Sequence, residues 1–82
     1  MKNVTIYTTS ACVYCKMTKE FFAQKNVAYT EKDVATDQIA AQEMIDKSGQ
    51  MGVPVTIISE EGKEEIIVGF DEERLTSVLG VA

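Results

Sequence analysis

The sequence predicts an α/β fold in which three helices flank a four-stranded mixed sheet, in the order β-α-β-α-β-β-α. Runs of β-branched and aromatic residues alternate along the chain with apolar residues at helical spacing. The chain begins with a strand, a helix and a strand joined by short connections, which favours a parallel pair with a right-handed crossover. Two strands joined by a tight turn come later and are antiparallel. Helices covering a mixed sheet are the compact arrangement of these elements.

The first strand is predicted at residues 3–8, where valine, threonine, isoleucine and tyrosine gather. The first helix is predicted at residues 13–25. Thr9 and Ser10 are expected to start this helix, because their short polar side chains can cap free backbone N–H groups. Asn26 tolerates the left-handed conformation that ends a helix. The sequence therefore places a strand-to-helix junction close to residue 12.

The second strand is predicted at residues 27–31, and a second helix follows it. Thr36 and Asp37 supply the capping and first-turn residues of that helix, and Gly49 ends it. The third strand is predicted at residues 55–58, directly after the only proline of the chain. This half of the sequence therefore continues the alternation of strands and helices.

The last strand is predicted at residues 65–68, separated from the third by a hairpin turn at Glu61 and Gly62. The last helix is expected to begin at Asp71 and to end at Gly80. The apolar residues at strand and helix spacing are the predicted core: Tyr7, Phe21, Phe22, Tyr29, Met44, Leu75, Val78 and Leu79.

Length and composition indicate one small domain, residues 1–82, with 45% apolar residues for a single core. The sequence shows no pattern of a signal peptide and no apolar run long enough to cross a membrane. The net charge of −5 argues against nucleic acid as a partner. A cytoplasmic protein without membrane or nucleic-acid partners is therefore expected.

Charge is distributed unevenly along the chain. Residues 1–32 carry five lysines and two glutamates, a net charge of +3, and residues 59–74 carry seven acids and two bases, a net charge of −5. Both segments are interpreted first as solvated faces. Lys16 and Lys19 nevertheless follow the cysteines closely, so a local positive field that favours an anionic sulfur is expected there.

The two cysteines, Cys12 and Cys15, are three residues apart at the strand-to-helix junction. This spacing lets them form a disulfide, because residues three apart share one face of a helix. A ring this short constrains the unfolded chain very little, so a redox or metal-binding role is favoured over a structural one. The positive end of the helix favours the thiolate of Cys12. Cys12 is therefore the predicted nucleophile, and Cys15, expected to be more buried, the resolving thiol.

The absence of histidine limits the other functions of the pair. A cysteine hydrolase of the papain type lacks its base, and one chain cannot supply the four ligands of a zinc site. No metal site within one chain is expected. Two alternatives to a thiol–disulfide oxidoreductase stay open: a carrier in which Cys12 holds an iron–sulfur cluster or zinc between two chains, and a structural domain with inert thiols.

Three motifs together resemble the glutaredoxins, the shortest form of the thioredoxin fold, over essentially the whole chain. They are Cys12-Val13-Tyr14-Cys15, Gly52-Val53-Pro54-Val55 and Gly69-Phe70-Asp71-Glu72. The resemblance implies a thioredoxin-like fold and reduction of protein disulfides or glutathione mixed disulfides, in electron transport and cell redox homeostasis. Glutathione is the implied co-substrate, and no tightly bound cofactor is expected.

The resemblance also implies roles for residues outside the cysteine pair. Pro54 is expected to be cis and its loop to pack beside Cys12, although most X–Pro bonds are trans. The backbone of Val53 is expected to pair with an incoming cysteine-containing peptide. The residues implied to line the glutathione or substrate site are Tyr14, Val53, Pro54, Gly69, Phe70, Asp71 and Glu72.

Three departures from the glutaredoxin pattern point to a second source of electrons. Glutaredoxins typically have proline at position 13, a Gly-Gly pair before the last helix, and a basic residue shortly before the first cysteine. This chain has Val13, Gly69-Phe70 and Thr8 to Ala11 there. The Cys-Val-x-Cys pair and the Gly69-Phe70 pair also resemble the redoxins that reduce ribonucleotide reductase with electrons from thioredoxin reductase, whereas Tyr14 resembles the glutaredoxins. The expected partners are glutathione, a thioredoxin reductase, or both, and disulfide-containing or glutathionylated proteins, with the protein acting as a monomer.

Overall fold

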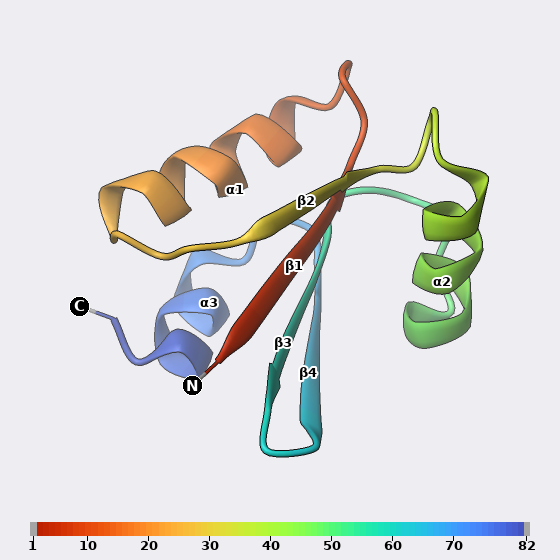
Figure 1. The fold of residues 1–82 in the computed structure, drawn as a ribbon. Helices are drawn as coiled ribbons and strands as arrows, with labels where there is room; N and C mark the ends of the chain where they lie inside the picture. Colours follow the sequence, from red (N-terminus) through yellow and green to blue (C-terminus); the bar gives the residue numbers. More distant parts are fainter. Residues whose placement is uncertain (1, 82) are drawn as a thin grey trace.

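The computed structural model describes residues 2–81 and confirms the predicted order of elements (Figure 1). The strands are β1 (Asn3–Thr8), β2 (Thr30–Asp33), β3 (Val55–Glu60) and β4 (Lys63–Val68), and the helices are α1 (Val13–Gln24), α2 (Gln38–Ser48) and α3 (Glu72–Leu79). The strands follow the order β2-β1-β3-β4 across the sheet. β1 is parallel to β2 and antiparallel to β3, and β4 is antiparallel to β3, so the sheet is mixed as predicted.

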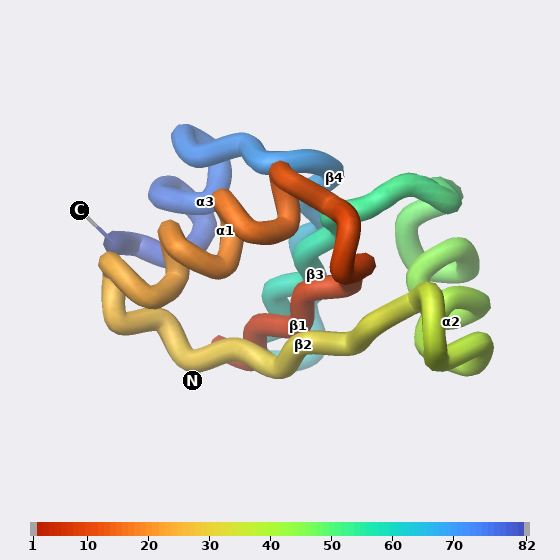
Figure 2. The backbone as a smooth tube through the Cα atoms, turned by 90° about the horizontal axis from the view of Figure 1, so that it is seen from above, coloured from red at the N-terminus to blue at the C-terminus, as the bar shows by residue number. Residues whose placement is uncertain are grey.

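Two hydrophobic clusters fill the two sides of the sheet. Figure 2 shows α1 and α3 over one face and α2 over the other. Under α1 and α3 the buried residues are Val4, Ile6, Phe21, Phe22, Ile58, Ile67 and Leu75. Under α2 they are Tyr7, Ala40, Met44, Val55 and Ile57. Val78 and Leu79 pack against the first cluster. Alternate residues of β1 and β3 point to opposite faces, so each central strand contributes to both clusters.

The predicted ends of α2, α3 and the hairpin are confirmed. The side chain of Asp37 accepts a hydrogen bond from the backbone N–H of Ala40 at 3.1 Å, which caps α2. Asp71 and Gly80 bound α3 as expected. Glu61 and Gly62 have φ angles of 52° and 82°, as the two central residues of a type I′ hairpin turn require.

The prediction of the second strand at residues 27–31 is wrong, because β2 occupies Thr30–Asp33. The backbone N–H of Val27 donates to the Phe22 carbonyl at 2.8 Å, so this residue closes the end of α1 instead of joining the sheet. Asn26 has the expected positive φ, 56°. β2 is an edge strand of four polar residues and lacks the apolar alternation that marks a half-buried strand.

The prediction of Tyr29 as a core residue is also wrong. Its side chain is 37% exposed, although its ring lies against that of Phe22 with 5.1 Å between the centroids. Tyr29 lies in the irregular segment between α1 and β2, outside both helix and sheet. Its ring therefore covers the edge of the cluster, whereas the other predicted core residues are buried or half-buried within the clusters.

A polar network links three elements on the α2 side. The buried hydroxyl of Tyr7 (β1) donates a hydrogen bond to Glu43 (α2), and Nζ of Lys32 (β2) lies 2.7 Å from the same carboxylate. Lys32 also lies over the Tyr7 ring, 5.8 Å from its centroid. Two hydrogen bonds hold the pKa of Glu43 below its ordinary value of 4.5. The bond from Lys32 has the larger effect, and the bond from Tyr7 comes second. Burial is the main cause that raises the pKa of Tyr7.

Replacing Glu43 with glutamine is expected to destabilise the fold by about 1 kcal/mol at pH 7, after discounting for partial exposure. A carboxylate with a lowered folded-state pKa stabilises the protein above its ordinary pKa, and this stabilisation is lost as the pH falls through the folded value. The difference between wild type and variant should therefore shrink at pH 3. Urea denaturation at pH 7 and at pH 3 measures this difference in the free energy of unfolding, and Glu60→Gln is the control at an exposed position. An equal loss at both pH values would contradict this assignment.

Within residues 2–81, no helix has the length and apolar character needed to cross a membrane.

Candidate active site

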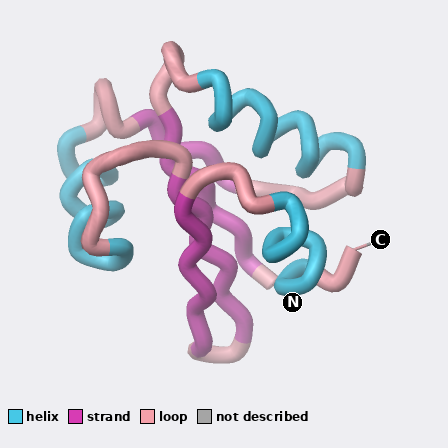
Figure 3. The backbone as a smooth tube through the Cα atoms, turned by 180° about the vertical axis from the view of Figure 1, so that it is seen from behind, coloured by secondary structure: helices cyan, strands magenta, loops and turns pink. Residues whose placement is uncertain are grey.

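One end of the sheet gathers the segments that carry the predicted site residues. Tyr7 of β1 pairs with Val55 of β3, which in turn pairs with Val68 of β4. The loops after β1, before β3 and after β4 must therefore lie at the same end. Figure 3 shows them at the end of the sheet opposite the β3–β4 turn. This topology brings together the cysteine pair, the proline and the start of α3.

Cys12 itself caps α1. Its backbone is extended, with φ −90° and ψ 114°, and its Sγ accepts a hydrogen bond from the backbone N–H of Cys15 at 3.0 Å. The expectation that Thr9 and Ser10 start the helix is wrong, because the chain first makes a turn in which the Cys12 N–H donates to the Thr9 carbonyl at 3.3 Å. The sulfur thus occupies the position where free N–H groups and the helix dipole favour an anion.

The two sulfurs are joined in a disulfide, and the Cα atoms of Cys12 and Cys15 are 5.2 Å apart. This separation lies in the usual range for disulfides. Cys15 is 1% exposed, whereas Cys12 is half-buried. The pair therefore presents one sulfur toward solvent and one toward the core, as predicted from their places on the helix.

The loop before β3 has the conformation that the resemblance implies. The Val53–Pro54 peptide is cis, Pro54 is buried, and Val53 is half-buried against the α2-side cluster. The Pro54 carbonyl accepts a hydrogen bond from the Gly69 N–H at 2.8 Å. This bond ties the proline loop directly to the segment that leads into α3.

The start of α3 is strongly acidic. The Asp71 side chain accepts a hydrogen bond from the Arg74 backbone N–H at 3.1 Å, and Glu72 and Glu73 follow in the first turn. All three carboxylates are exposed. Phe70 instead turns inward, with its ring centroid 6.2 Å from that of Phe21. The predicted residues of this segment thus divide into a packed aromatic ring and a solvated, negatively charged helix end.

A shallow groove runs between α1 and the start of α3. Seven residues line it: Met17, Glu20, Phe21, Gln24, Lys25, Phe70 and Glu72. Two of the predicted glutathione residues, Phe70 and Glu72, therefore border a concave surface. A wider hollow along α2 contains none of the predicted site residues.

Exposed apolar side chains lie within the cysteine motif, further along α1, and in the loop before the proline. Tyr14 is 61% exposed and Val13 is 68% exposed, and both lie between the cysteines. Met17 on α1 and Met51 before the proline are exposed as well. Sequence reasoning assigned Tyr14 to the site but did not identify Val13 or Met51. The position of Val13 between the two cysteines could have indicated a role at the site. No feature of the sequence around Met51 indicates one.

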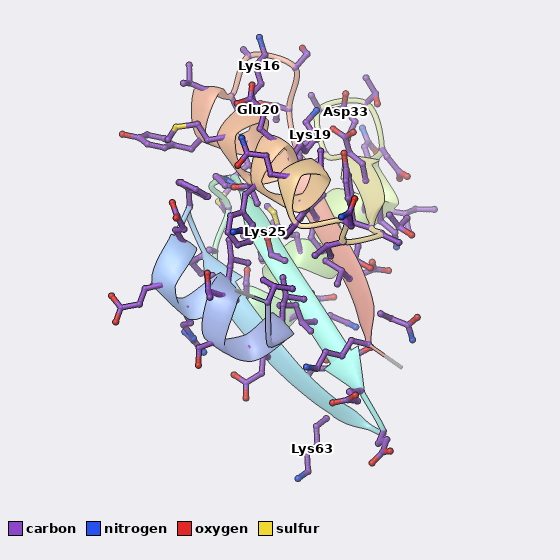
Figure 4. All side chains as sticks on the ribbon, turned by 90° about the vertical axis from the view of Figure 1, so that its left-hand side faces the viewer. Lys16, Lys19, Glu20, Lys25, Asp33 and Lys63 are labelled. Carbon is purple, nitrogen blue, oxygen red and sulfur yellow. A yellow bond between two sulfur atoms is a disulfide. The ribbon has the colours of Figure 1, made fainter. Side chains whose placement is uncertain are left out.

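The expected positive field near the cysteines is only partly present. Lys19 forms an ion pair with Glu31 at 2.9 Å, and the buried hydroxyl of Thr8 donates to the same carboxylate at 2.7 Å. Both bonds hold the pKa of Glu31 below its ordinary value, and the bond from Lys19 has the larger effect. Lys16 projects from the outer surface of α1 (Figure 4). The charge of Lys19 is therefore largely balanced, and the cluster joins α1, β1 and β2 instead.

No three histidine, cysteine, aspartate or glutamate side chains gather as a metal site among residues 2–81.

Comparison with known proteins identifies relatives along nearly the whole chain. The model of the glutaredoxin family matches residues 4–62. A glutaredoxin-like protein from a rubredoxin operon of Clostridium pasteurianum is 38% identical over 76 residues, covering 93% of this chain and 96% of the relative. The crystal structure of a thioredoxin-like protein is 30% identical with a TM-score of 0.86, and all of both chains is covered.

The fold is also shared with the glutaredoxin-like NrdH-redoxin of Escherichia coli, which has a thioredoxin-like activity profile. The two chains are 22% identical with a TM-score of 0.78, and the match covers 93% of each. At this identity the likeness concerns the fold alone. The structural resemblance thus includes both groups of redoxins that the sequence motifs indicated.

Proposed function

The chain belongs to the glutaredoxin family of thiol redox proteins, and on this premise we propose that it is a thiol–disulfide oxidoreductase with Cys12 as nucleophile and Cys15 as resolving thiol. One observation supports this division above all. The Cys12 sulfur caps a helix and is half-buried, whereas Cys15 is enclosed one turn later. An incoming disulfide meets Cys12 first.

The proposed cycle balances bonds and electrons. The Cys12 thiolate attacks one sulfur of the substrate disulfide, that S–S bond breaks, and the departing sulfur takes up a proton. Cys15 then loses its proton and attacks Cys12 Sγ, which releases the reduced substrate and leaves the Cys12–Cys15 disulfide. Two glutathione molecules restore the dithiol and become glutathione disulfide. Because both sulfurs come from one chain, a monomer can complete the cycle. A redox-active cysteine pair of this kind is typical of the reducing cytosol.

Substrate binding is proposed to use the backbone of Val53 and the side chain of Tyr14. Val53 precedes the buried Pro54, whose carbonyl is already bonded to Gly69. That bond fixes the loop, so a peptide can pair with a preset backbone segment. Tyr14 offers an exposed ring beside the cysteines. Together these groups would hold the residues on either side of a substrate cysteine.

Glutathione is proposed as the electron donor, bound between Tyr14 and the segment Gly69, Phe70, Asp71 and Glu72. The groove between α1 and α3, which Phe70 and Glu72 border, supports this site. Asp71 and Glu72 offer carboxylates to the ammonium group of glutathione. In this arrangement the helix start recognises the positive end of the tripeptide.

A thioredoxin reductase is the second candidate donor, and the charge at α3 favours it. Glutathione carries a net negative charge, whereas Asp71, Glu72 and Glu73 place three exposed carboxylates at one helix end. Asp71 also occupies the Arg74 N–H that a ligand carboxylate would otherwise use. A protein donor would recognise the exposed apolar residues around Cys12 and would not need a glutathione site.

A coupled assay of NADPH oxidation distinguishes the two donors. Reduction of an insulin or model disulfide is measured with glutathione and glutathione reductase, and separately with thioredoxin reductase alone. We expect turnover with the glutathione system. Turnover only with thioredoxin reductase would establish the second candidate. A protein that forms the Cys12–Cys15 disulfide but turns over with neither donor would contradict the oxidoreductase proposal.

A further inference from the structure

Thr56 of β3 is completely buried, and its hydroxyl is unpaired. Its exposed fraction is 0%, and Oγ1 has no hydrogen-bond partner among the residues that the structure describes. Buried hydroxyls are nearly always hydrogen-bonded, because an unsatisfied one loses its interaction with water and gains nothing in return. The packing of the sheet therefore does not explain why a hydroxyl group is buried at this position.

The register of the sheet places Thr56 on the face covered by α1 and α3. Its neighbours in β3, Val55 and Ile57, belong to the cluster under α2, so Thr56 points to the opposite side. It pairs with Ile6 on one side and with Ile67 on the other, and both belong to the α1-side cluster. The hydroxyl thus lies on a central strand, on the face that the helix carrying the cysteines covers together with α3.

Thr56 and the buried cysteine lie on the same side of the sheet and toward the same end of it. Thr56 is two residues from Pro54, at the same end of the sheet as the start of α1. Of the buried residues of α1, Cys15 is the one nearest that end, and Phe22 lies two turns further along. One turn after Cys15, the buried hydroxyl of Thr18 already donates a hydrogen bond to the Tyr14 carbonyl, which leaves the sulfur of Cys15 as the candidate partner that α1 offers to Thr56.

We propose that the Thr56 hydroxyl is a positioning group for the resolving cysteine and forms its hydrogen bond with the Cys15 sulfur when the protein is reduced. In the disulfide form, Cys15 offers a neutral sulfur already bonded to Cys12. Reduction breaks the S–S bond, and two glutathione molecules supply two electrons and two protons while becoming glutathione disulfide. The Cys15 thiol or thiolate is then a better partner, since a thiol both donates and accepts and a thiolate accepts strongly.

The hydrogen bond has a definite effect on the redox equilibrium. The unpaired hydroxyl destabilises the disulfide form, and the new bond stabilises the reduced form, so both contributions favour reduction. Removing the hydroxyl should shift the equilibrium toward the disulfide. This inference rests on the proposed exchange of Cys12 and Cys15 between dithiol and disulfide, and it adds a determinant of how readily that exchange occurs.

The test is Thr56→Val, which removes the hydroxyl and keeps the shape. Wild type and variant are equilibrated in glutathione and glutathione disulfide mixtures at pH 7, and the oxidised fraction is read after acid quenching. We expect the variant to favour the disulfide by about 3- to 10-fold, from the usual worth of one hydrogen bond. A tenfold change is about 30 mV in the two-electron potential.

Two further variants separate this role from a purely structural one. Thr56→Ser keeps the hydroxyl and should stay within about twofold of wild type, the spread expected without a lost bond. Thr18→Val removes an equally buried hydroxyl that already donates to the Tyr14 carbonyl at 2.9 Å, and it should also leave the equilibrium unchanged.

An unchanged equilibrium in Thr56→Val, or an equal shift in Thr56→Ser, would overturn the inference. If Thr56→Val does not fold, the Thr56→Ala and Thr56→Ser pair is compared, and equal equilibria in that pair overturn it as well. The proposed function is tested separately by the wild type, because failure of wild-type protein to form any Cys12–Cys15 disulfide in the same mixtures removes the function itself.

Discussion

Replacing Cys12 with serine is expected to abolish both reduction of protein disulfides and removal of glutathione from glutathionylated proteins. A serine hydroxyl at the start of α1 does not ionise near pH 7 and is not a nucleophile without a base, and the chain contains no histidine. Cys15 cannot take over, because it is 1% exposed. Rates should fall to those of glutathione alone, as measured in the NADPH-coupled assay.

Replacing Cys15 with serine is expected to separate the two activities. Without a resolving thiol, a mixed disulfide between Cys12 and a protein substrate persists, so dithiol reduction is lost. Glutathione can still release Cys12 from a mixed disulfide with glutathione, so deglutathionylation should remain. The persistent adduct is detected by mass spectrometry of the protein.

Circular dichroism of both cysteine variants is the control for folding, since the fold does not require this short ring. If Cys15→Ser also loses deglutathionylation while it stays folded, glutathione is not the electron donor. If Cys12→Ser keeps either activity, Cys12 is not the nucleophile. The two variants therefore test the donor and the assignment of roles independently.

The parts of the site that the sequence predicted are those that depend on local spacing. Cys12 and Cys15 come together because they are three residues apart at the start of α1, where Cys12 is the cap and Cys15 lies in the first turn. Asp71 caps α3 through a bond to a residue only three positions away. The cis peptide of Pro54, in contrast, followed only from resemblance to a family, since local preference favours trans.

The parts that the sequence did not predict depend on contacts between distant residues. Tyr7 and Glu43 are 36 residues apart, and no local pattern connects a strand tyrosine with a helix glutamate. The pairing of Lys19 with Glu31 likewise required the position of β2, which sequence reasoning placed too early. The field around the cysteines was overestimated for this reason.

Helical spacing alone does not distinguish buried from exposed side chains near the site. Tyr14 and Met17 follow the apolar spacing of α1 together with Phe21 and Phe22, yet both are exposed. The buried side chains of α1 are Cys15, Thr18, Phe21 and Phe22, so the first turns are covered as well, and Tyr14 and Met17 lie at the edge of the buried stripe. Spacing along a helix identifies a face, but only the tertiary structure shows how much of that face is covered.

Replacing Phe22 with alanine is expected to lower the free energy of unfolding by about 3–5 kcal/mol, the usual cost of removing a buried aromatic ring. Phe22 is completely buried and lies at the centre of an aromatic group, with its ring centroid 6.1 Å from that of Phe21 and 5.1 Å from that of Tyr29. A domain of this size has a total stability of about 5–15 kcal/mol. The substitution should therefore remove a large part of it.

Urea denaturation of the oxidised protein measures the loss from the shift in midpoint at constant slope. Ile39→Ala on the exposed face of α2 is the control, because that side chain is 80% exposed and its removal should change the stability by no more than about 0.5 kcal/mol. A loss below about 1 kcal/mol in Phe22→Ala would mean that the site collapses without a cavity. α1 would then be held to the sheet mainly by its other contacts, including the Lys19–Glu31 pair, and not by this ring.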